Sequence, residues 1–273
     1  MPALLLGTRT RTALNGLVEQ ATTPNGEVHL KSERVLLVLW WIAVAGALWE
    51  MVRPAIFPSP LDVVHAFPAL WFEDGLGQEL LASLRVSGEA LLLSAAIALP
   101  LAYVSRVPAL RPLARGVAKL RFLSPSVFFT LLLFLAASGH LVKVYMLTLG
   151  EACFLITTMI GVVDAIPNER FDDCRTLRMS AWTATWYVII RGTVPQALDA
   201  IRDNNAMGWA SLIMVERIVQ AEGGVGVLIF NNEKHMNFAS VWAVALAILT
   251  IGLVLDALLG AVRRTLCPYA EAR

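Results

Sequence analysis

Three carboxyl groups interrupt apolar stretches of this sequence, and they are its clearest candidates for chemistry. Glu89, Glu151 and Glu216 each lie in or near a run of hydrophobic residues long enough to approach the thickness of a bilayer. An ionisable group at that depth usually faces a protein interior or a water-filled cavity, where it can contact a solute or relay a proton. We therefore take these three residues as candidates for lining a pathway across a membrane.

Each carboxyl also has a structural alternative. Arg85 precedes Glu89 by about one helical turn, so the two can pair on one helix face. Glu151 has only Lys143, two turns back, as a cation within helical reach. We expect Glu216 near the outer end of its span, where a structural hydrogen bond or a contact to a partner is favoured over solute binding. Acidic groups along a path would suit a zwitterion, a cation or a neutral heterocycle better than a simple anion.

The sequence offers little support for enzyme chemistry. It contains no G-x-x-x-x-G-K-[ST] segment to cradle phosphates, no His pair at metal spacing and no plausible Ser, His and Asp arrangement. Its histidines are expected in the N-terminal tail and in solvated external loops, and its three cysteines are widely spaced, which favours neither a metal site nor a disulfide framework. The glycine-rich segment at 223–226 has no following Lys-Ser/Thr, so Gly224 and Gly226 predict a re-entrant or gate-forming loop. We expect no catalytic site, metal or cofactor in this chain.

Composition defines the elements that must position these residues. The chain has 273 residues, of which 57% are hydrophobic and 16% charged, and its mean hydropathy is +0.65. Soluble domains carry about 25% charged residues. The sequence therefore predicts an all-α, polytopic membrane protein with a transmembrane domain over 35–265, between tails at 1–34 and 266–273. Six spans are expected, at about 35–52, 80–104, 124–138, 144–166, 200–220 and 238–262.

Turn signals divide the segments between these spans. Four prolines exclude one continuous helix over 53–78, and Ser59-Pro60 is a helix start signal that predicts a short surface helix over 61–71. The segment 222–237 is expected to be a glycine-rich external loop. In the last span, Asp256 is expected to be a structural hydrogen-bond acceptor.

A polar and basic stretch from Phe171 to Asp203 stands apart from the apolar runs. Each Asp or Arg at the centre of a bilayer costs roughly 2.5 to 3.5 kcal/mol, so this stretch must lie at a membrane face or outside. Its pattern predicts a short helix over 172–179, a turn at Ser180, a second helix with Trp182, Trp186 and Tyr187, and a stop at Gly192 and Pro195. Aromatic and charged side chains on two short helices indicate a docking surface for a soluble partner.

The distribution of Lys and Arg predicts which face of the membrane this stretch occupies. One face would carry Arg9, Arg11, Lys31, Arg34, Arg106, Arg111, Arg115, Lys119, Arg121, Arg170, Arg175, Arg178, Arg191, Arg202, Arg263, Arg264 and Arg273. The other face would carry only Arg53, Arg85, Lys143, Arg217 and Lys234. The positive-inside rule makes the first face cytoplasmic. Six spans then leave both termini and the polar stretch on the cytoplasmic side.

The order of these features resembles the permease subunit of a type I ABC importer, in the nitrate, sulfonate, taurine and bicarbonate class. The resemblance covers about 35–265. It rests on short matches in sequence order: Phe57-Pro58-Ser59-Pro60, Ser83-Leu84-Arg85, Leu123-Ser124-Pro125, Asp172-Asp173-Cys174-Arg175-Thr176-Leu177, Val194-Pro195, Val215-Glu216 with Gly224-Val225-Gly226, and Asp256 followed by Arg263-Arg264.

In permeases of this kind the polar stretch, here 168–195, holds a coupling helix that docks into an ATPase subunit. The resemblance assigns that contact to Asp172, Asp173, Cys174, Arg175, Leu177, Arg178 and Trp182. The family pattern is Glu-Ala-Ala, three residues, then Gly, and this chain departs from it by placing Arg178 at the glycine. Either a second, different permease carries the intact motif, or the ATPase groove accepts the arginine.

The resemblance implies alternating access in a bacterial inner membrane. A periplasmic binding protein would deliver a small solute to a pathway between this chain and a second permease, as a homodimer or a heterodimer, the latter favoured by Arg178. Two ATPase subunits would bind ATP and Mg, and no nucleic acid is involved. Two alternatives remain: a non-transporting membrane scaffold or coupling subunit, and a secondary transporter with Glu151 as a proton relay, which would predict inverted repeats that we do not find.

Overall fold

A computed structural model describes residues 31–52 and 57–268, and these residues are helical with no strand among them. The expected all-α architecture is confirmed. Most of the N-terminal tail, Arg53 and the end of the C-terminal tail lie outside the described residues. The chain divides into two compact units, 1–62 and 63–273, and each is described by itself.

The first unit contains helix α2 (Lys31–Val52) and the start of helix α3 (Pro60–Phe72). The apolar part of α2 runs over Val38–Met51. Helix α3 begins at Pro60, as the start signal predicts. The Ser59 hydroxyl accepts a hydrogen bond from the Asp62 amide at 3.1 Å, and the Asp62 carboxylate accepts one from the Ser59 amide at 2.8 Å. This reciprocal pair satisfies amide groups that the first helical turn leaves without partners.

Three helices of the second unit are long and apolar enough to cross a membrane: α4 (Leu76–Val104), α7 (Gly139–Asp164) and α12 (Phe238–Leu266). They correspond to the second, fourth and sixth expected spans. A fourth candidate is the bent pair formed by Arg111–Phe122 and Pro125–Leu135. The described residues therefore contain three or four spans by length and composition.

The segment 111–135, which includes most of the third expected span at 124–138, is not one straight helix. It consists of α5 (Arg111–Ala118), the 3-10 turns η1 (Lys119–Phe122) and η2 (Pro125–Phe128), and the short helix α6 (Phe129–Leu135), with a bend of 99°. Leu123 and Ser124, just before the proline, have extended backbone conformations. Proline disfavours the helical conformation of the residue before it, which explains the break.

The region of the fifth expected span belongs to one continuous helix, α10 (Val194–Ile218). The helix begins before the expected start of the span at residue 200, so residues 194–199 belong to it as well. Arg202, Asp203, Asn204 and Asn205 make α10 more polar than the three candidate spans.

The expectation of an external loop over 222–237 is wrong for most of its length, because helix α11 (Val225–Lys234) occupies it. Gly223 and Gly224 precede this helix, whereas Gly226, expected in a gate-forming loop, lies in its first turn. From Val225 onward an apolar face forms, and Val225 and Ile229 are both buried one turn apart.

Small side chains on α4 allow the closest packing in the second unit. The most extensive helix contact joins α4 to α7. Ala98 and Ala102 of α4 are fully buried in a cluster with Leu155, Ile156 and Met159 of α7. Small residues let two helix backbones approach each other, which favours association where apolar burial alone does not.

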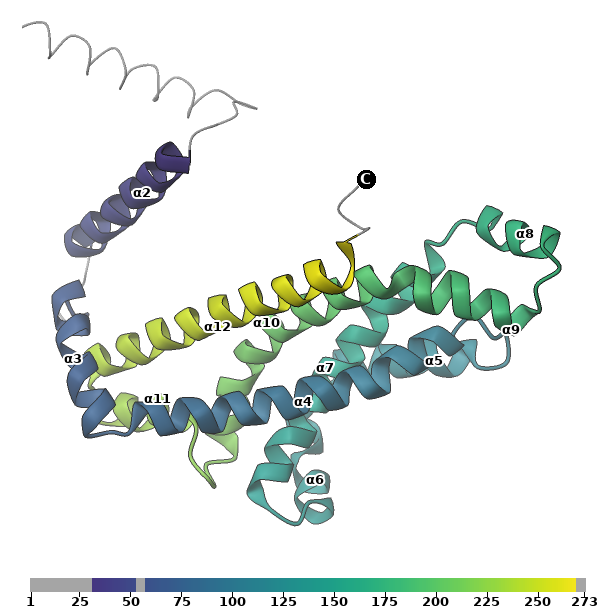
Figure 1. Cartoon of the computed structure of the whole chain (residues 1–273). Coiled ribbons are helices and arrows are strands. Elements are labelled where there is room, and N and C mark those ends of the chain that lie inside the picture. The colour runs from purple at the N-terminus through teal and green to yellow at the C-terminus, as the bar shows by residue number, and fades with distance from the viewer. Residues whose placement is uncertain (1–30, 53–56, 269–273) are drawn as a thin grey trace, which may run out of the picture. The chain divides into compact units, whose positions relative to one another are not determined.

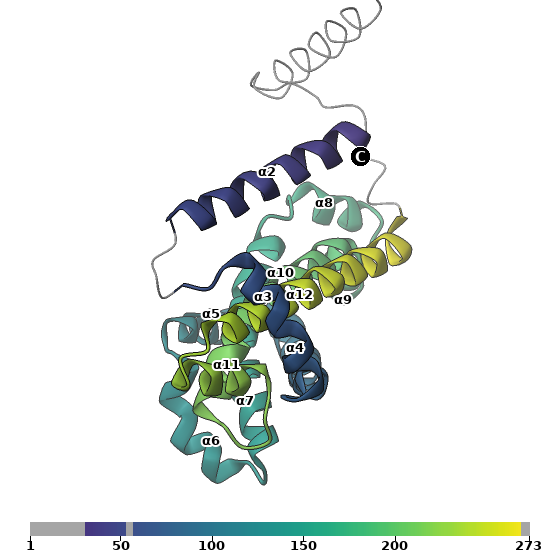
Figure 2. The same cartoon turned by 90° about the vertical axis from the view of Figure 1, so that its left-hand side faces the viewer.

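The second unit has two distinct ends, which polar contacts define. One end is here called the arm end, because the segment between α7 and α10 projects from it. At this end Arg115 of α5 donates to Asp164 of α7 at 2.8 Å, and Arg263 of α12 pairs with Asp199 of α10 at 2.6 Å. At the other, the loop end, the start of α4 meets the segment that leads into α11. Figures 1 and 2 show α4, α10 and α12 running between these ends.

The packing of α4 on α7 predicts the effect of a larger side chain. We expect Ala98→Leu to lower the free energy of unfolding by about 1 to 3 kcal/mol, because the added atoms have no space at this contact. The matched control is Ala96→Leu, which makes the same change at an exposed position of α4. Thermal unfolding of the purified protein measures both, and equal Tm values for the two variants would contradict the packing described here.

Candidate functional site

The polar stretch forms a projecting arm between α7 and α10. It contains α8 (Glu169–Thr176), α9 (Ala181–Ala184), a π-helical segment η3 (Thr185–Ile190) and a 3-10 turn η4 (Arg191–Thr193). Figure 1 shows α8 standing off from the helices that it connects. The expected turn at Ser180 is confirmed, since its hydroxyl caps α9 by accepting from the Thr183 amide at 3.2 Å.

The expected stop at Gly192 and Pro195 is wrong. The chain stays helical through η3 and η4, and α10 begins directly at Val194. Pro195 lies in the first turn of α10, where a missing N–H costs no hydrogen bond. The proline therefore starts a helix at this point.

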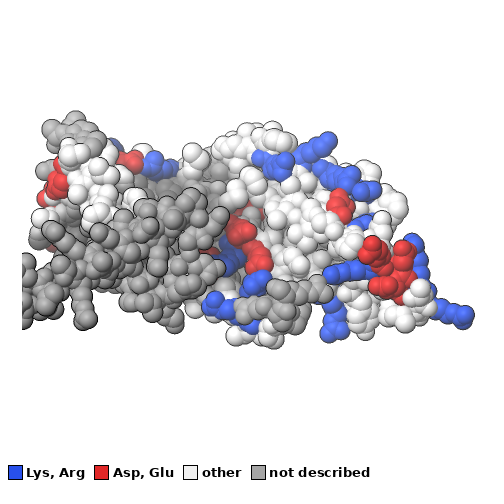
Figure 3. Space-filling model, turned by 90° about the horizontal axis from the view of Figure 1, so that it is seen from above, with Lys and Arg blue, Asp and Glu red and all other residues white. Residues whose placement is uncertain are grey.

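The arm offers an open surface of mixed character. Of the seven residues that the resemblance assigns to ATPase contact, six are exposed, and Cys174 alone is buried. Leu177 and Trp182 leave large apolar side chains uncovered, at 68% and 73% exposure. Figure 3 shows Lys, Arg, Asp and Glu side chains gathered toward the end of the molecule where α8 and α5 lie in Figure 1.

Arg178 closes helix α8 in a left-handed conformation, with φ of 53°. The Met179 amide donates to the Cys174 carbonyl at 3.0 Å, and the Arg178 amide donates to the Arg175 carbonyl at 2.9 Å. These two bonds form a Schellman motif, in which the residue at the Arg178 position is usually glycine. The arginine thus adopts the backbone conformation for which the family motif has glycine.

A cluster of buried polar groups holds the glycine-rich segment at the loop end. Glu216 is completely buried, and its two carboxylate oxygens accept hydrogen bonds from the Ser83 hydroxyl at 2.6 Å and from the Gly226 amide at 2.7 Å. The Ser83 hydroxyl in turn accepts a bond from the Val225 amide at 2.9 Å. The structural hydrogen bond expected of Glu216 is therefore present. We call Ser83, Glu216 and residues 223–226 the loop cluster.

Two further charged side chains bind the same segment. Glu79 accepts a hydrogen bond from the Gly224 amide, and the buried Lys143 donates to the Gly223 carbonyl at 2.5 Å. Gly224 has φ of 115°, and a Cβ atom there would overlap the Glu216 carboxylate. This segment therefore packs against α4, α7 and α10 and has no room for side chains at Gly224.

Glu89 is paired on both oxygens. Arg85 donates to one at 2.9 Å, as their spacing predicts, and the His140 ring lies 2.7 Å from the other. The expectation that His140 is a solvated surface residue is wrong, because it sits in the first turn of α7 facing α4. Asp256 of α12 accepts two hydrogen bonds from Arg202 of α10, which confirms it as a structural acceptor.

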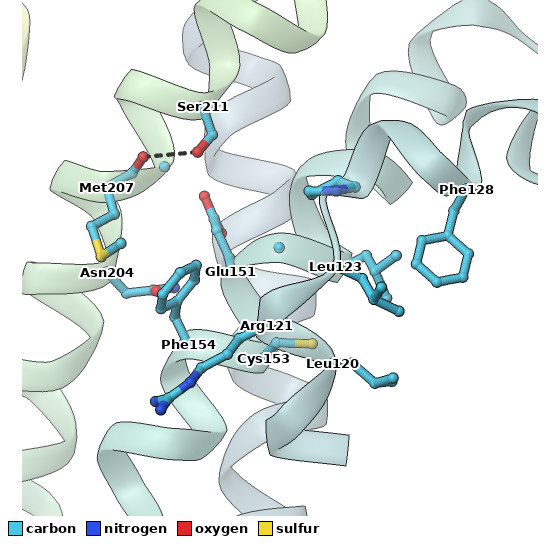
Figure 4. A pocket seen from close by; sticks show the side chains of 14 residues that line it. Leu120, Arg121, Leu123, Phe128, Glu151, Cys153, Phe154, Asn204, Met207 and Ser211 are labelled. Carbon is cyan, nitrogen blue, oxygen red and sulfur yellow. Dashed lines mark hydrogen bonds between the residues drawn. The ribbon is translucent and has the colours of Figure 1, made fainter. Parts of the chain in front are cut away.

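Glu151 lies in the middle of α7, with twelve residues of the helix before it and thirteen after it. It is deeper than expected, because α7 begins at Gly139 and the predicted span began at 144. One of its oxygens accepts a bond from Ser94 of α4 at 3.2 Å, and Lys143 binds elsewhere. Figure 4 shows the carboxyl in a cavity between α7, α10 and the broken segment that precedes α6.

The sequence does not indicate the serine partners of Glu216 and Glu151. Ser83, Ser87 and Ser94 share one buried face of α4, and two of them bond Glu216 and Glu151. Small polar residues at helical spacing in an apolar run are a signal for this kind of contact. Glu79 and Lys143 carried no such signal, because their bonds go to backbone atoms more than 75 positions away.

Comparison with known proteins shows which family this chain resembles. A model of the family described as "Binding-protein-dependent transport system inner membrane component" matches residues 91–266. The taurine transport system permease protein TauC of Escherichia coli (strain K12) is 24% identical over 245 residues, which cover 86% of each chain. The nitrate import permease protein NrtB of Synechococcus elongatus is 24% identical over 247 residues, covering 82% of this chain and 87% of NrtB.

The loop cluster predicts that Gly226 cannot carry a side chain. A Cβ atom there would lie 2.5 Å from the Ile213 carbonyl oxygen and 2.8 Å from the Glu216 Cβ. We expect Gly226→Ala to lower the free energy of unfolding by about 1 to 3 kcal/mol and to expose the preceding loop to protease. Gly252→Ala in α12, with nothing within 4 Å, is the matched control and should be as stable as the wild type or more stable by up to about 1 kcal/mol, because alanine favours the helix. Protease cleavage at 220–224 that is equal in both variants would contradict this account.

The Schellman motif predicts opposite effects for the same substitution at two arginines of the arm. Arg178→Gly should preserve or increase amide protection at Met179, by up to about 1 kcal/mol, because glycine adopts positive φ without a steric penalty. Arg175→Gly, inside α8, should reduce that protection by about 1 kcal/mol. Hydrogen exchange of the arm measures both. Loss of protection in Arg178→Gly would show that the arginine side chain itself holds the turn.

Proposed function

Because the chain belongs to the family of binding-protein-dependent transport system inner membrane components, we propose that it is the membrane-spanning permease subunit of an ATP-driven importer. It forms the pathway for a small solute that a periplasmic binding protein delivers. Relatives named for taurine and nitrate transport support a small solute. The observation that carries the proposal is the exposed arm, because a permease without an ATP site of its own must bind the ATPase that drives it.

The arm is suited to that contact by its chemistry. Aromatic and arginine side chains are enriched where protein interfaces gain most of their binding energy, and Trp182 and Leu177 are available for such burial. Arg175 and Asp172 pair with each other at 2.7 Å on the open surface, where charges orient a partner without a large cost of dehydration. We propose that α8 and Trp182 enter a groove of the ATPase.

The positions of basic residues support a cytoplasmic arm. Arg106, Arg111 and Arg115 contact the end of α7, and Arg263 contacts the start of α10, so these four lie at the arm end. By the positive-inside rule, we propose that the arm end, and with it the C-terminus of α12, faces the cytoplasm. The loop end, with α11, would face the binding protein.

A second permease completes the pathway. Leu249, Leu253, Val254 and Leu258 leave one side of α12 apolar and exposed, which suits contact with lipid or with another permease. An arm with arginine at position 178 and an arm with glycine present different surfaces to their ATPases. We therefore propose a heterodimer, with two ATPases that supply ATP and Mg chemistry outside this chain.

The proposal predicts that an ATPase with a phosphate-binding loop copurifies with the tagged protein from its native membrane, together with a second permease. We expect Trp182→Ala to reduce the recovered ATPase at least tenfold, because removal of a central aromatic anchor typically costs about 2 kcal/mol or more. Quantitative mass spectrometry of the eluate measures the recovery.

Trp41→Ala is the matched control, since Trp41 is a similarly exposed tryptophan of α2 at 66% exposure. It should leave ATPase recovery unchanged. Recovery of the folded wild-type chain without any ATPase would contradict the proposed function. Equal losses in both tryptophan variants would exclude the arm as the specific contact.

A further inference from the structure

Glu151 and Asn204 are buried polar side chains with unused bonding capacity, and both line the cavity shown in Figure 4. Each is only 4% exposed. Among the described residues, Glu151 Oε1 and Asn204 Nδ2 have no hydrogen-bond partner. Buried polar groups are nearly always bonded, so two unbonded groups at one cavity indicate a ligand.

The two groups differ in their hydrogen-bonding roles. Glu151 offers a carboxyl oxygen, which accepts, and Asn204 offers an amide N–H, which donates. None of the ion pairs between described residues includes Glu151. The guanidinium of Arg121, another lining residue, lies over the Phe122 ring at 5.1 Å and points away from Glu151 in Figure 4. Within 31–52 and 57–268, therefore, no residue pairs a cation with this carboxyl.

The backbone of α10 leaves room for the carboxyl itself. Gly208 of α10 faces Glu151, and a Cβ atom at Gly208 would overlap the Oε1 atom. The break before α6 provides the third wall through Leu123, Pro125 and Phe128. Irregular backbone at membrane depth is tolerated only where it is buried in protein or lines a polar cavity. One cavity thus combines the break before α6, the missing side chain of Gly208 and the unbonded oxygen of Glu151.

The remaining walls suit a small organic cation. Phe154 and Met207 contribute aromatic and sulfur surfaces, which are favourable for an ammonium group. Ser211 donates its hydroxyl to the Met207 carbonyl at 3.2 Å, so its oxygen still accepts. The cavity has a volume of about 70 Å³. That is about half of the roughly 150 Å³ that admits benzene, so it holds a group of a few heavy atoms.

We propose that this cavity binds the amino end of the transported solute. A protonated primary amine bonds Glu151 Oε1, and a hydrogen-bond acceptor within a few atoms of that amine bonds Asn204 Nδ2. The solute class is thus a small amine that carries a nearby oxygen, such as an amino alcohol or an amino acid. This inference rests on the proposed transport function for its physiological meaning, while the binding itself requires only this chain.

Three probe molecules of similar size separate the two contacts. Ethanolammonium has both groups, ethylammonium lacks the oxygen, and ethylene glycol lacks the amine. Saturation-transfer NMR titrations against the full chain in lipid nanodiscs measure each affinity. We expect ethanolammonium to bind more tightly than ethylammonium by about threefold to tenfold, and ethylene glycol to bind at least tenfold more weakly than ethanolammonium. Equal binding of ethylene glycol, or no binding of either amine, would overturn the proposal.

Variants assign the contacts to individual residues. Glu151→Gln should weaken both amines at least tenfold, whereas Asn204→Ala should remove only the advantage of ethanolammonium over ethylammonium. Glu73→Gln is the control, because it makes the same change at an exposed position after α3 that does not line the cavity, and it should leave all affinities unchanged. If Glu151→Gln does not fold, Gly208→Ala tests the same site from α10 and should also weaken both amines.

Unchanged affinities in the folded Glu151→Gln and Gly208→Ala variants would place binding elsewhere and overturn the assignment. These measurements use the chain without its ATPase, so they are independent of the copurification experiment. Recovery of an ATPase without amine binding would remove this inference and leave the proposed function intact. Amine binding without recovery of an ATPase would contradict the proposed function and leave the binding site intact.

Discussion

The buried carboxylate of Glu216 constrains the loop end of this protein more than any other group described. A charged oxygen in an apolar interior must be bonded, because leaving it unbonded costs far more than a hydrogen bond contributes. Here the bonds come from Ser83 of α4 and from the first turn of α11, where the helix also presents its positive end. Shifting either helix by one residue would leave the carboxylate without a partner. The cluster therefore fixes the register of α4, α10 and α11, and Lys143 brings α7 to the same segment.

The helices could be predicted from the sequence where an apolar run has clear ends, and not where the backbone changes type within a run. The expected span at 80–104 corresponds to α4 (Leu76–Val104), and the one at 238–262 corresponds to α12 (Phe238–Leu266). The joining of η3, η4 and α10 into one helical path depends on tertiary packing, which propensity does not record. The glycines at 223–226 predict a loop where helix α11 lies. The helical spacing of Val225 and Ile229 is the signal that favours the helix.

The sequence indicates which types of residue form the candidate site, but not which residues contact one another between helices. Spacing along one helix is visible in a sequence, so the pairing of Arg85 with Glu89 was expected and is present. The partner of Glu216 lies 133 positions away on another helix, and no local pattern indicates it. His140 was assigned to the surface for the same reason, since its bond to Glu89 is made between helices. The arm is different in this respect: the resemblance expects glycine at position 178, and Arg178 there has the positive φ that glycine favours.

Glu216 and Glu151 show that equal burial does not imply an equal role. Both are carboxyls inside the helical unit, and both bond a serine of α4. Glu216 uses both oxygens within the fold: one accepts from the Ser83 hydroxyl, and the other accepts from the Gly226 amide, which a side chain at that position would keep away. Glu151 uses one. The elements around it are held by other contacts: α4 packs on α7 through small residues, and Arg202–Asp256 and Arg263–Asp199 tie α10 to α12. The fold does not need the second oxygen of Glu151 for assembly, and an unbonded buried acceptor reduces stability. A group that costs stability without serving assembly is best explained by a contact made only when a solute is present.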